Sequence, residues 1–153
     1  MPEIADSDRI RALVSRAARL LDAGAYDRFL DLFTKDGRYC IEAASAELGR
    51  QMTWMDLGRS ELAALFEEYP DHVVDKATRL HLVTTDEVEI ADDSGHALST
   101  FAVFRTDLHG ASALYAVGHY EDVFVRQGQT WKLRSRKVRL ETRQFTVPTP
   151  LPL

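Results

Sequence analysis

From residue 79 onward the sequence alternates apolar and polar side chains, and this period of two constrains the fold more than any other feature. Successive side chains of a β-strand point to opposite faces, so apolar residues at every second position indicate a strand. The apolar residues that share a parity are Leu80, Leu82, Val88 and Ile90 in the first run, and Phe101 and Val103 in the second.

Short polar segments divide this half of the chain into four runs. Residues 92–95 read Asp-Asp-Ser-Gly, residues 107–110 end in Gly, and residues 127–129 read Gln-Gly-Gln. Such segments form tight turns. The pattern therefore predicts four long, consecutive strands that form an antiparallel meander, and strands of about a dozen residues require a sheet that twists and coils strongly.

The first half of the chain has the period of helices instead. Apolar residues recur at three- and four-residue spacing from Ile10 to Leu21, after Asp6 and Ser7 as candidate caps. A shorter stripe runs from Tyr26 to Phe33, and Asp36-Gly37 indicates a turn after it.

A third helix is predicted between a cap at Ser60 and Pro70, and residues 70–77 are expected to be a connector. Residues 38–42 suggest a short strand, whereas residues 43–58 have no sustained period. The chain is thus predicted to be one α+β domain, residues 1–153, in which N-terminal helices cover an antiparallel sheet.

Composition excludes several classes of protein. The net charge of -5 and the isoelectric point near 5.5 disfavour a nucleic-acid surface, which needs a basic face. Cys40 is the only cysteine, so this chain alone holds no disulfide, thiolate zinc site or iron–sulfur cluster. The sequence has neither the pattern of a signal peptide nor an apolar run long enough to span a membrane. We therefore expect a cytoplasmic protein without a membrane partner.

The titratable residues of the predicted sheet suggest two readings. His81 and His119 lie in strands among apolar residues, while His72, His96 and His109 fall in connectors or turns, and their spacing supports no metal site. Asp22 ends the first helix, where a negative charge gains nothing from the helix dipole.

In the catalytic reading, Asp22, His81 and His119 form an acid–base set and Tyr39 polarises a carbonyl, as in a dehydratase or isomerase. In the structural reading, both histidines are hydrogen-bonded interior or interface residues, and Asp22 pairs with Arg79 or Arg105. The structural reading is favoured because ion pairs and satisfied histidines outnumber catalytic ones.

The C-terminal part offers a different kind of candidate. Arg136, Arg139 and Arg143 belong to a basic stripe that would suit a protein partner better than a phosphate. Residues 146–153 contain three prolines and are predicted to be an extended tail, because proline cannot donate to a sheet. Its Leu151 and Leu153 require an apolar contact.

Several short runs of residues, taken in their order along the chain, resemble the small (beta) subunit of aromatic-ring-hydroxylating dioxygenases. They cover roughly residues 10–145 and include Arg19-Leu20-Leu21-Asp22, Arg79-Leu80-His81-Leu82, Phe101-Ala102-Val103-Phe104-Arg105-Thr106, Gly118-His119-Tyr120-Glu121-Asp122 and Trp131-Lys132-Leu133. The wider superfamily includes nuclear transport factor 2, scytalone dehydratase and ketosteroid isomerase. The resemblance implies the cone-shaped fold of that superfamily, with helices in the concave face of a long, curved, mainly antiparallel sheet.

The resemblance also implies a function. The chain would be a non-catalytic small subunit that braces the large (alpha) subunits of an α3β3 oxygenase acting in aromatic catabolism, and this chain could form a trimer on its own. A Rieske [2Fe-2S] cluster, a mononuclear Fe(II) and the active site would lie on the large subunit, with no cofactor or metal in this chain. Arg136, Arg139, Arg143, Leu151 and Leu153 would then form the assembly surface. The alternative is a free-standing dehydratase or isomerase that uses Asp22, His81, His119 and Tyr39.

Overall fold

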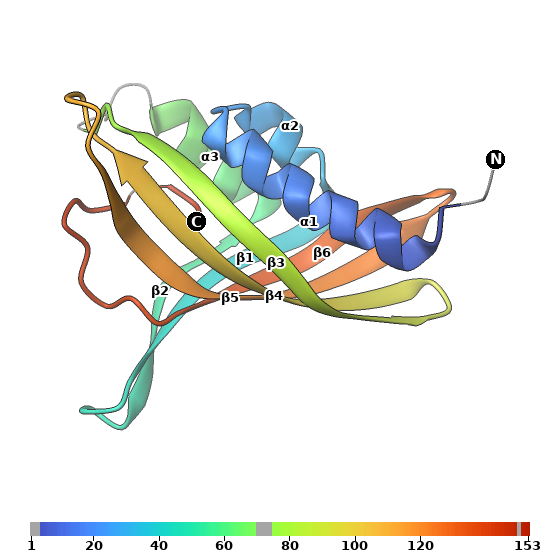
Figure 1. The fold of residues 1–153 in the computed structure, drawn as a ribbon. Helices are drawn as coiled ribbons and strands as arrows, with labels where there is room; N and C mark the ends of the chain where they lie inside the picture. Colours follow the sequence, from blue (N-terminus) through green and yellow to red (C-terminus); the bar gives the residue numbers. More distant parts are fainter. Residues whose placement is uncertain (1–3, 70–74, 150) are drawn as a thin grey trace.

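Three helices lie in the concave side of one six-stranded sheet in the computed structural model, which describes residues 4–69, 75–149 and 151–153 (Figure 1). The elements are α1 (Asp6–Asp22), α2 (Tyr26–Leu30), β1 (Phe33–Ser45), β2 (Arg50–Gly58), α3 (Arg59–Glu68), β3 (Thr78–Ala91), β4 (Ser94–Thr106), β5 (Ser112–Gln127) and β6 (Thr130–Leu140). The predicted α+β fold with a long, curved sheet is confirmed.

The strands follow the order β2-β1-β6-β5-β4-β3. Neighbours are antiparallel except β1 and β6, which are parallel. Strands β3 to β6 therefore form the predicted meander, and β1 joins it at the β6 side. The three turns lie where the Gly- and Asp-rich segments predicted them.

Helix α1 packs its apolar stripe on the inner face of the sheet. Ile10, Val14, Ala17 and Leu21 are buried in the common core. The indole Nε1 of Trp131, at the start of β6, donates a hydrogen bond to the Asp6 carboxylate (3.1 Å). This hydrogen bond joins the first turn of α1 to the start of β6.

The second helix is shorter than predicted. It ends at Leu30, and β1 runs through Asp36 and Gly37, so the expected turn at that pair is wrong. The register between β1 and β6 shifts between Phe33 and Arg38. A Cβ on Gly37 would lie 2.9 Å from the carbonyl oxygen of Thr34, so a close backbone approach requires this glycine.

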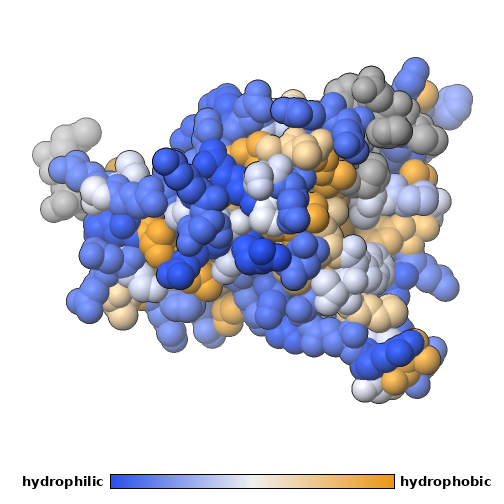
Figure 2. Space-filling view, turned by 180° about the vertical axis from the view of Figure 1, so that it is seen from behind, coloured by the Kyte–Doolittle hydropathy of each residue, from blue (hydrophilic) through white to orange (hydrophobic). Residues whose placement is uncertain are grey.

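Residues 43–58, whose apolar residues have no regular spacing, form the outer hairpin of the sheet. The turn end of the β1–β2 hairpin projects from the body of the molecule (Figure 1). Much of β2 is exposed, and Met55 and Leu57 near its end pack against the core, so the strand as a whole has no regular alternation of apolar and polar residues. Seen from behind, hydrophilic residues cover most of the surface, and hydrophobic residues also lie on this projecting hairpin (Figure 2).

Helix α3 begins at Arg59, one residue before the predicted cap. The backbone N–H of Gly58 donates to the Glu61 carboxylate (2.8 Å), so Glu61 and not Ser60 satisfies this end of the helix. Leu62 and Phe66 of α3 are buried. Pro70, His72 and most of the predicted connector lie outside the described residues.

A β-bulge divides β3 into two parts. The register between β3 and β4 shifts between Thr85 and Glu87. Before the bulge Leu80 and Leu82 point to the outer face, whereas Val88 after it packs against the core. The single parity seen in the sequence is therefore split between two faces, because the extra residue of a bulge reverses the alternation.

Candidate functional site

Asp22 and His81 form a hydrogen-bonded pair inside the cone. The Oδ1 of Asp22 lies 2.5 Å from the ring Nδ1 of His81, and Oδ2 accepts the backbone N–H of the same histidine (2.8 Å). The side chains are 13% and 2% exposed, respectively. The carboxylate thus fixes both the position and the orientation of the imidazole.

Local structure explains how two residues 59 positions apart meet. Asp22 is the last residue of α1, and Gly24 follows with a left-handed φ of 65°, which ends the helix and turns the chain away. His81 occupies the inward position between Leu80 and Leu82 on β3. Because α1 packs along β3, the end of the helix meets the strand at this histidine. The expected pairing of Asp22 with Arg79 or Arg105 is wrong.

An Asp–His pair with this geometry could serve as a base only if a substrate reached the second ring nitrogen. The Nε2 of His81 is buried and has no hydrogen-bond partner within the described residues. Access to it would require movement of the packed side chains around it. In this conformation the pair orients the interior but presents no base to solvent.

The other two residues of the predicted acid–base set lie elsewhere. His119 is exposed on the outer face of β5, with its Nδ1 3.4 Å from the hydroxyl of Thr100. The neighbouring Tyr120 takes the inward position instead. The expectation that His119 shares the interior with Asp22 and His81 is therefore wrong.

Tyr39 is buried and held by the C-terminal segment. Its hydroxyl donates to the carbonyl of Leu153 and accepts the backbone N–H of the same residue, both at 2.7 Å. Burial raises the pKa of Tyr39 well above its ordinary value. Its hydroxyl anchors the tail in this structure, and polarising a carbonyl of a substrate would require it to release Leu153.

Residues 151–153 fill the inner side of the molecule. Leu153 is fully buried and Leu151 nearly so, and both belong to the core cluster. Tyr115 donates to the carbonyl of Val147 (2.6 Å), and Arg79 donates to the hydroxyl of Thr149 (2.9 Å). The prediction of Leu151 and Leu153 as partner contacts is wrong in this conformation, because the tail finds its apolar contact within its own chain.

Arg136 is also buried. Its guanidinium forms two hydrogen bonds of 2.8 Å to Asp122, both side chains are fully buried, and it lies 4.1 Å from the ring centre of Tyr120. Burial has the largest single effect and lowers the pKa of Arg136, but the charge and the hydrogen bonds of Asp122, with smaller contributions from Tyr120 and Tyr39, together hold the pKa above its ordinary value. The expectation that Arg136 belongs to an exposed basic stripe is wrong, because this arginine faces the core.

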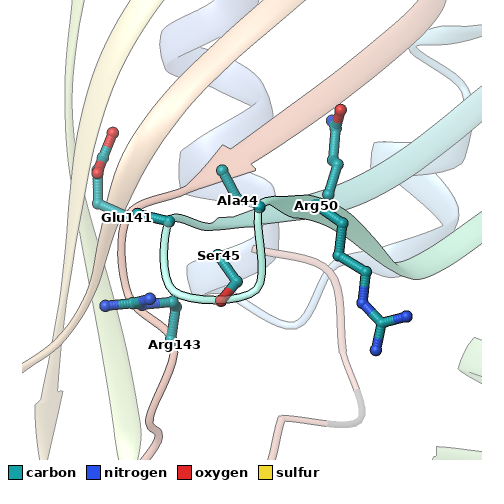
Figure 3. A pocket seen from close by; sticks show the side chains of 8 residues that line it. Ala44, Ser45, Arg50, Glu141 and Arg143 are labelled. Atoms are coloured by element: carbon teal, nitrogen blue, oxygen red, sulfur yellow. The ribbon is translucent and has the colours of Figure 1, made fainter.

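Two of the predicted basic residues do reach solvent. Arg139 on β6 pairs with Glu121 (2.9 Å). Arg143 lines an open cleft of about 520 Å³ between the β1–β2 turn and the segment after β6. In Figure 3 the guanidinium of Arg50 projects away from Glu141 and Arg143, so the charged groups of this cleft do not converge on one point.

An ion-pair cluster holds the other end of the inner side. Asp75 accepts two hydrogen bonds from Arg105, at 2.6 and 3.0 Å, and lies 3.6 Å from Arg79. The hydrogen bonds from Arg105 lower the pKa of Asp75 to about 2, against a smaller opposing effect of burial. This cluster fixes Arg79, which in turn binds the tail at Thr149.

Residues 4–69, 75–149 and 151–153 contain no group of three His, Cys, Asp or Glu side chains that could hold a metal ion. No helix within these residues is long and apolar enough to cross a membrane.

Comparison with known proteins identifies the family. Residues 2–137 match the model of the SnoaL-like domain. The chain is 30% identical over 151 residues to the beta subunit of 2-aminobenzenesulfonate 2,3-dioxygenase from an Alcaligenes species, covering 97% of this chain and 99% of the relative. It is 34% identical over 150 residues to the beta subunit of the methanesulfonate monooxygenase hydroxylase from Methylosulfonomonas methylovora, covering 91% and 82%.

Solved structures agree on the fold. A beta subunit from Novosphingobium aromaticivorans, described as part of an aromatic-ring-hydroxylating dioxygenase, superposes with a TM-score of 0.81 at 22% identity over 91% of each chain. The beta subunit of benzoate 1,2-dioxygenase from Burkholderia mallei gives 0.72 at 22% identity, over 92% and 93%. This chain belongs to the SnoaL-like family with the nuclear transport factor 2-like fold, among the beta subunits of ring-hydroxylating and related oxygenases.

Proposed function

We propose that this chain is the non-catalytic small subunit of a Rieske non-haem iron oxygenase and braces the large subunits that carry the chemistry. The observation that carries the proposal is the match to two oxygenase beta subunits over nearly the whole chain. The buried Nε2 of His81 supports it, because an enzyme of this fold that used the Asp22–His81 pair would need an open path to that nitrogen.

The donor atoms of the chain do not fit the cofactors of such an oxygenase. A Rieske cluster needs two cysteine and two histidine ligands, and this chain has one cysteine. A mononuclear iron needs two histidines and a carboxylate around open positions. We therefore assign the cluster, the iron and the reaction to the large subunit, in an α3β3 assembly, and this chain could also form a trimer on its own.

The substrate is then set by the large subunit. Both curated relatives are named for sulfonates, one aromatic and one not. We propose an organic substrate, with aromatic compounds and sulfonates as the first to be assayed, and a cytoplasmic location.

The alternative, a free-standing dehydratase or isomerase, has less support. It needs Asp22, His81 and His119 around one accessible cavity, but His119 lies on the opposite face of the sheet. In the remaining Asp22–His81 pair, the Nε2 of His81 is buried.

Co-expression tests the proposal. The chain is produced together with an oxygenase large subunit from the same genome, and the complex is purified through a tag on this chain. The expected result is a complex of three copies of each chain by light scattering, with iron that remains with the large subunit after the two are separated. Recovery of this chain alone, with no large subunit bound, would contradict the proposal.

A further inference from the structure

The outer face of the sheet carries an uncovered apolar surface at one end of β3, β4 and β5. Leu80 and Leu82 on β3 are 57% and 56% exposed, and Leu114 on β5 is 56% exposed. In the register of the sheet, Leu80 lies opposite Phe104 and Phe104 opposite Leu114, while the next row joins Leu82, Ala102 and Val117. We call these six residues the outer-face patch.

The patch follows from the way the chain folds. The helices pack on the inner face, where His81 and Val83 point, so the alternate residues of β3 before the bulge must point outward. Two complete cross-strand rows of apolar side chains make the surface contiguous, which single exposed leucines do not. A groove of about 370 Å³ opens beside the second row and is bordered by Thr100, His119 and Glu141.

The charges near the patch indicate what kind of surface would cover it. Asp86, Glu87 and Glu89 continue along β3 beyond the patch and are exposed, and Glu141 borders the groove. The nearest basic strand, β6, is the direct neighbour of β5, but its Arg139 is already paired with Glu121. The border of the patch is therefore acidic, in a chain whose net charge is -5.

This charge pattern favours a different chain over a second copy. Two copies joined through the patch would bring together acidic borders on two chains that are both negatively charged, and like charges across an interface weaken association. A partner with an apolar centre and basic residues around it would match both features.

We propose that the outer-face patch is the surface on which the large subunit docks, through an apolar area bordered by Lys and Arg. The assignment rests on the proposed function. It replaces the assembly surface that the sequence suggested, because Arg136, Leu151 and Leu153 are buried while the leucines of β3 are exposed. The large subunit would cover Leu80 and Leu82, and its basic residues would face Glu87 and Glu89.

The test compares two leucines of equal exposure. Leu82→Lys places a charge in the patch, and Leu48→Lys places the same charge on the β1–β2 turn, where Leu48 is 59% exposed. Each variant is purified, its thermal unfolding is compared with that of the unaltered chain, and its Kd for the separately purified large subunit is measured by calorimetry. Leu114→Lys provides a second change in the patch, on another strand, should Leu82→Lys fail to fold.

The expected result is a Kd raised about tenfold or more by Leu82→Lys or Leu114→Lys and unchanged by Leu48→Lys. Glu87→Lys should raise the Kd by a smaller factor that shrinks as salt is added. A Kd unchanged by the patch variants overturns the assignment. So does a result in which they abolish self-association of this chain and leave the Kd for the large subunit unaltered. If the unaltered chain binds no large subunit, the proposed function itself fails.

Discussion

The pair of Arg136 and Asp122 is the only ion pair among the described residues in which both side chains are fully buried. Both side chains are removed from water, and the two parallel hydrogen bonds use Nε and one terminal nitrogen of the guanidinium. The other terminal nitrogen, Nη1, has no partner within the described part of the chain. Desolvation opposes such a pair, so its stability depends on both partners being present.

Removing one partner should therefore cost more than removing both. We expect Arg136→Met to lower the free energy of unfolding by about 3–5 kcal/mol, because it leaves the Asp122 carboxylate buried and uncompensated. The double variant Asp122→Leu with Arg136→Met should recover most of this loss. Urea unfolding of the three proteins measures both effects, and a double variant less stable than the single one would contradict the argument.

The Asp75–Arg105 interaction predicts a pH dependence. The folded pKa of Asp75 is about 2, below the ordinary value of 3.8, so the charged form stabilises the fold above the ordinary pKa and the contribution is lost as the pH falls towards about 2. The difference corresponds to about 2 kcal/mol at neutral pH. Thermal unfolding should show that Asp75→Asn destabilises the chain clearly near about pH 6 and hardly at about pH 2.

Asp31→Asn is a suitable control for this measurement, because the Asp31 side chain is 73% exposed and its contact with Arg59 is long, at 3.5 Å. Its effect should be small at every pH. A loss of stability in Asp75→Asn that is the same at both pH values would show that the carboxylate charge is not the cause.

At the scale of elements, the tail is the feature that sequence reasoning placed least well. Its prolines correctly exclude it from the sheet, but nothing local predicts that Leu153 returns to Tyr39, which is 114 residues away. The tail is instead held by contacts with three inward residues, Tyr39, Arg79 and Tyr115. Only the assembled sheet brings these together.

The tail should therefore contribute to stability as part of the core. We expect Leu153→Ala to lower the free energy of unfolding by about 2–5 kcal/mol, because it removes a fully buried side chain while keeping the backbone contacts with Tyr39. Leu48→Ala, on the exposed turn, should change it by less than about 0.5 kcal/mol. Equal effects of the two substitutions in urea unfolding would contradict the packing seen here.

Local sequence patterns predict the order of the strands but not their exact register. The turns and the period of two predict the β3 to β6 meander, because both signals are local. Counting back from the β5–β6 turn would pair Asp122 with Ser135, but the irregularity after Val123 shifts its partner to Arg136. Bulges of this kind, here and after Thr85, decide which side chains face the core, and the sequence has no strong signal for them.

The same limit applies to the candidate site. The sequence singled out Asp22 and His81, and the structure brings them together because α1 packs along β3. The sequence also singled out His119. Whether His119 points towards the helices depends on which face of β5 they cover, and the sequence does not show this. Tyr120 and Asp122, which alternate with His119 along β5, point inward and are buried, but the sequence did not single them out.

At the scale of the whole molecule, the interior is filled and the outer face is partly apolar. Leu151 and Leu153 pack into the inner side of the cone. The outer side of the sheet exposes apolar rows on β3 to β5. This arrangement supports the proposed role of the chain as an assembly subunit.

The most direct test of this account is the turnover of the assembled oxygenase when the Asp22–His81 pair is disabled. Complexes are prepared with the unaltered chain and with Asp22→Asn, their subunit composition is verified by light scattering, and oxygenation is measured per bound iron. The account predicts equal turnover per iron in intact complexes, because the pair only orients the interior of this subunit. A loss of turnover in an intact, iron-loaded Asp22→Asn complex would contradict it and would give this chain a part in the chemistry.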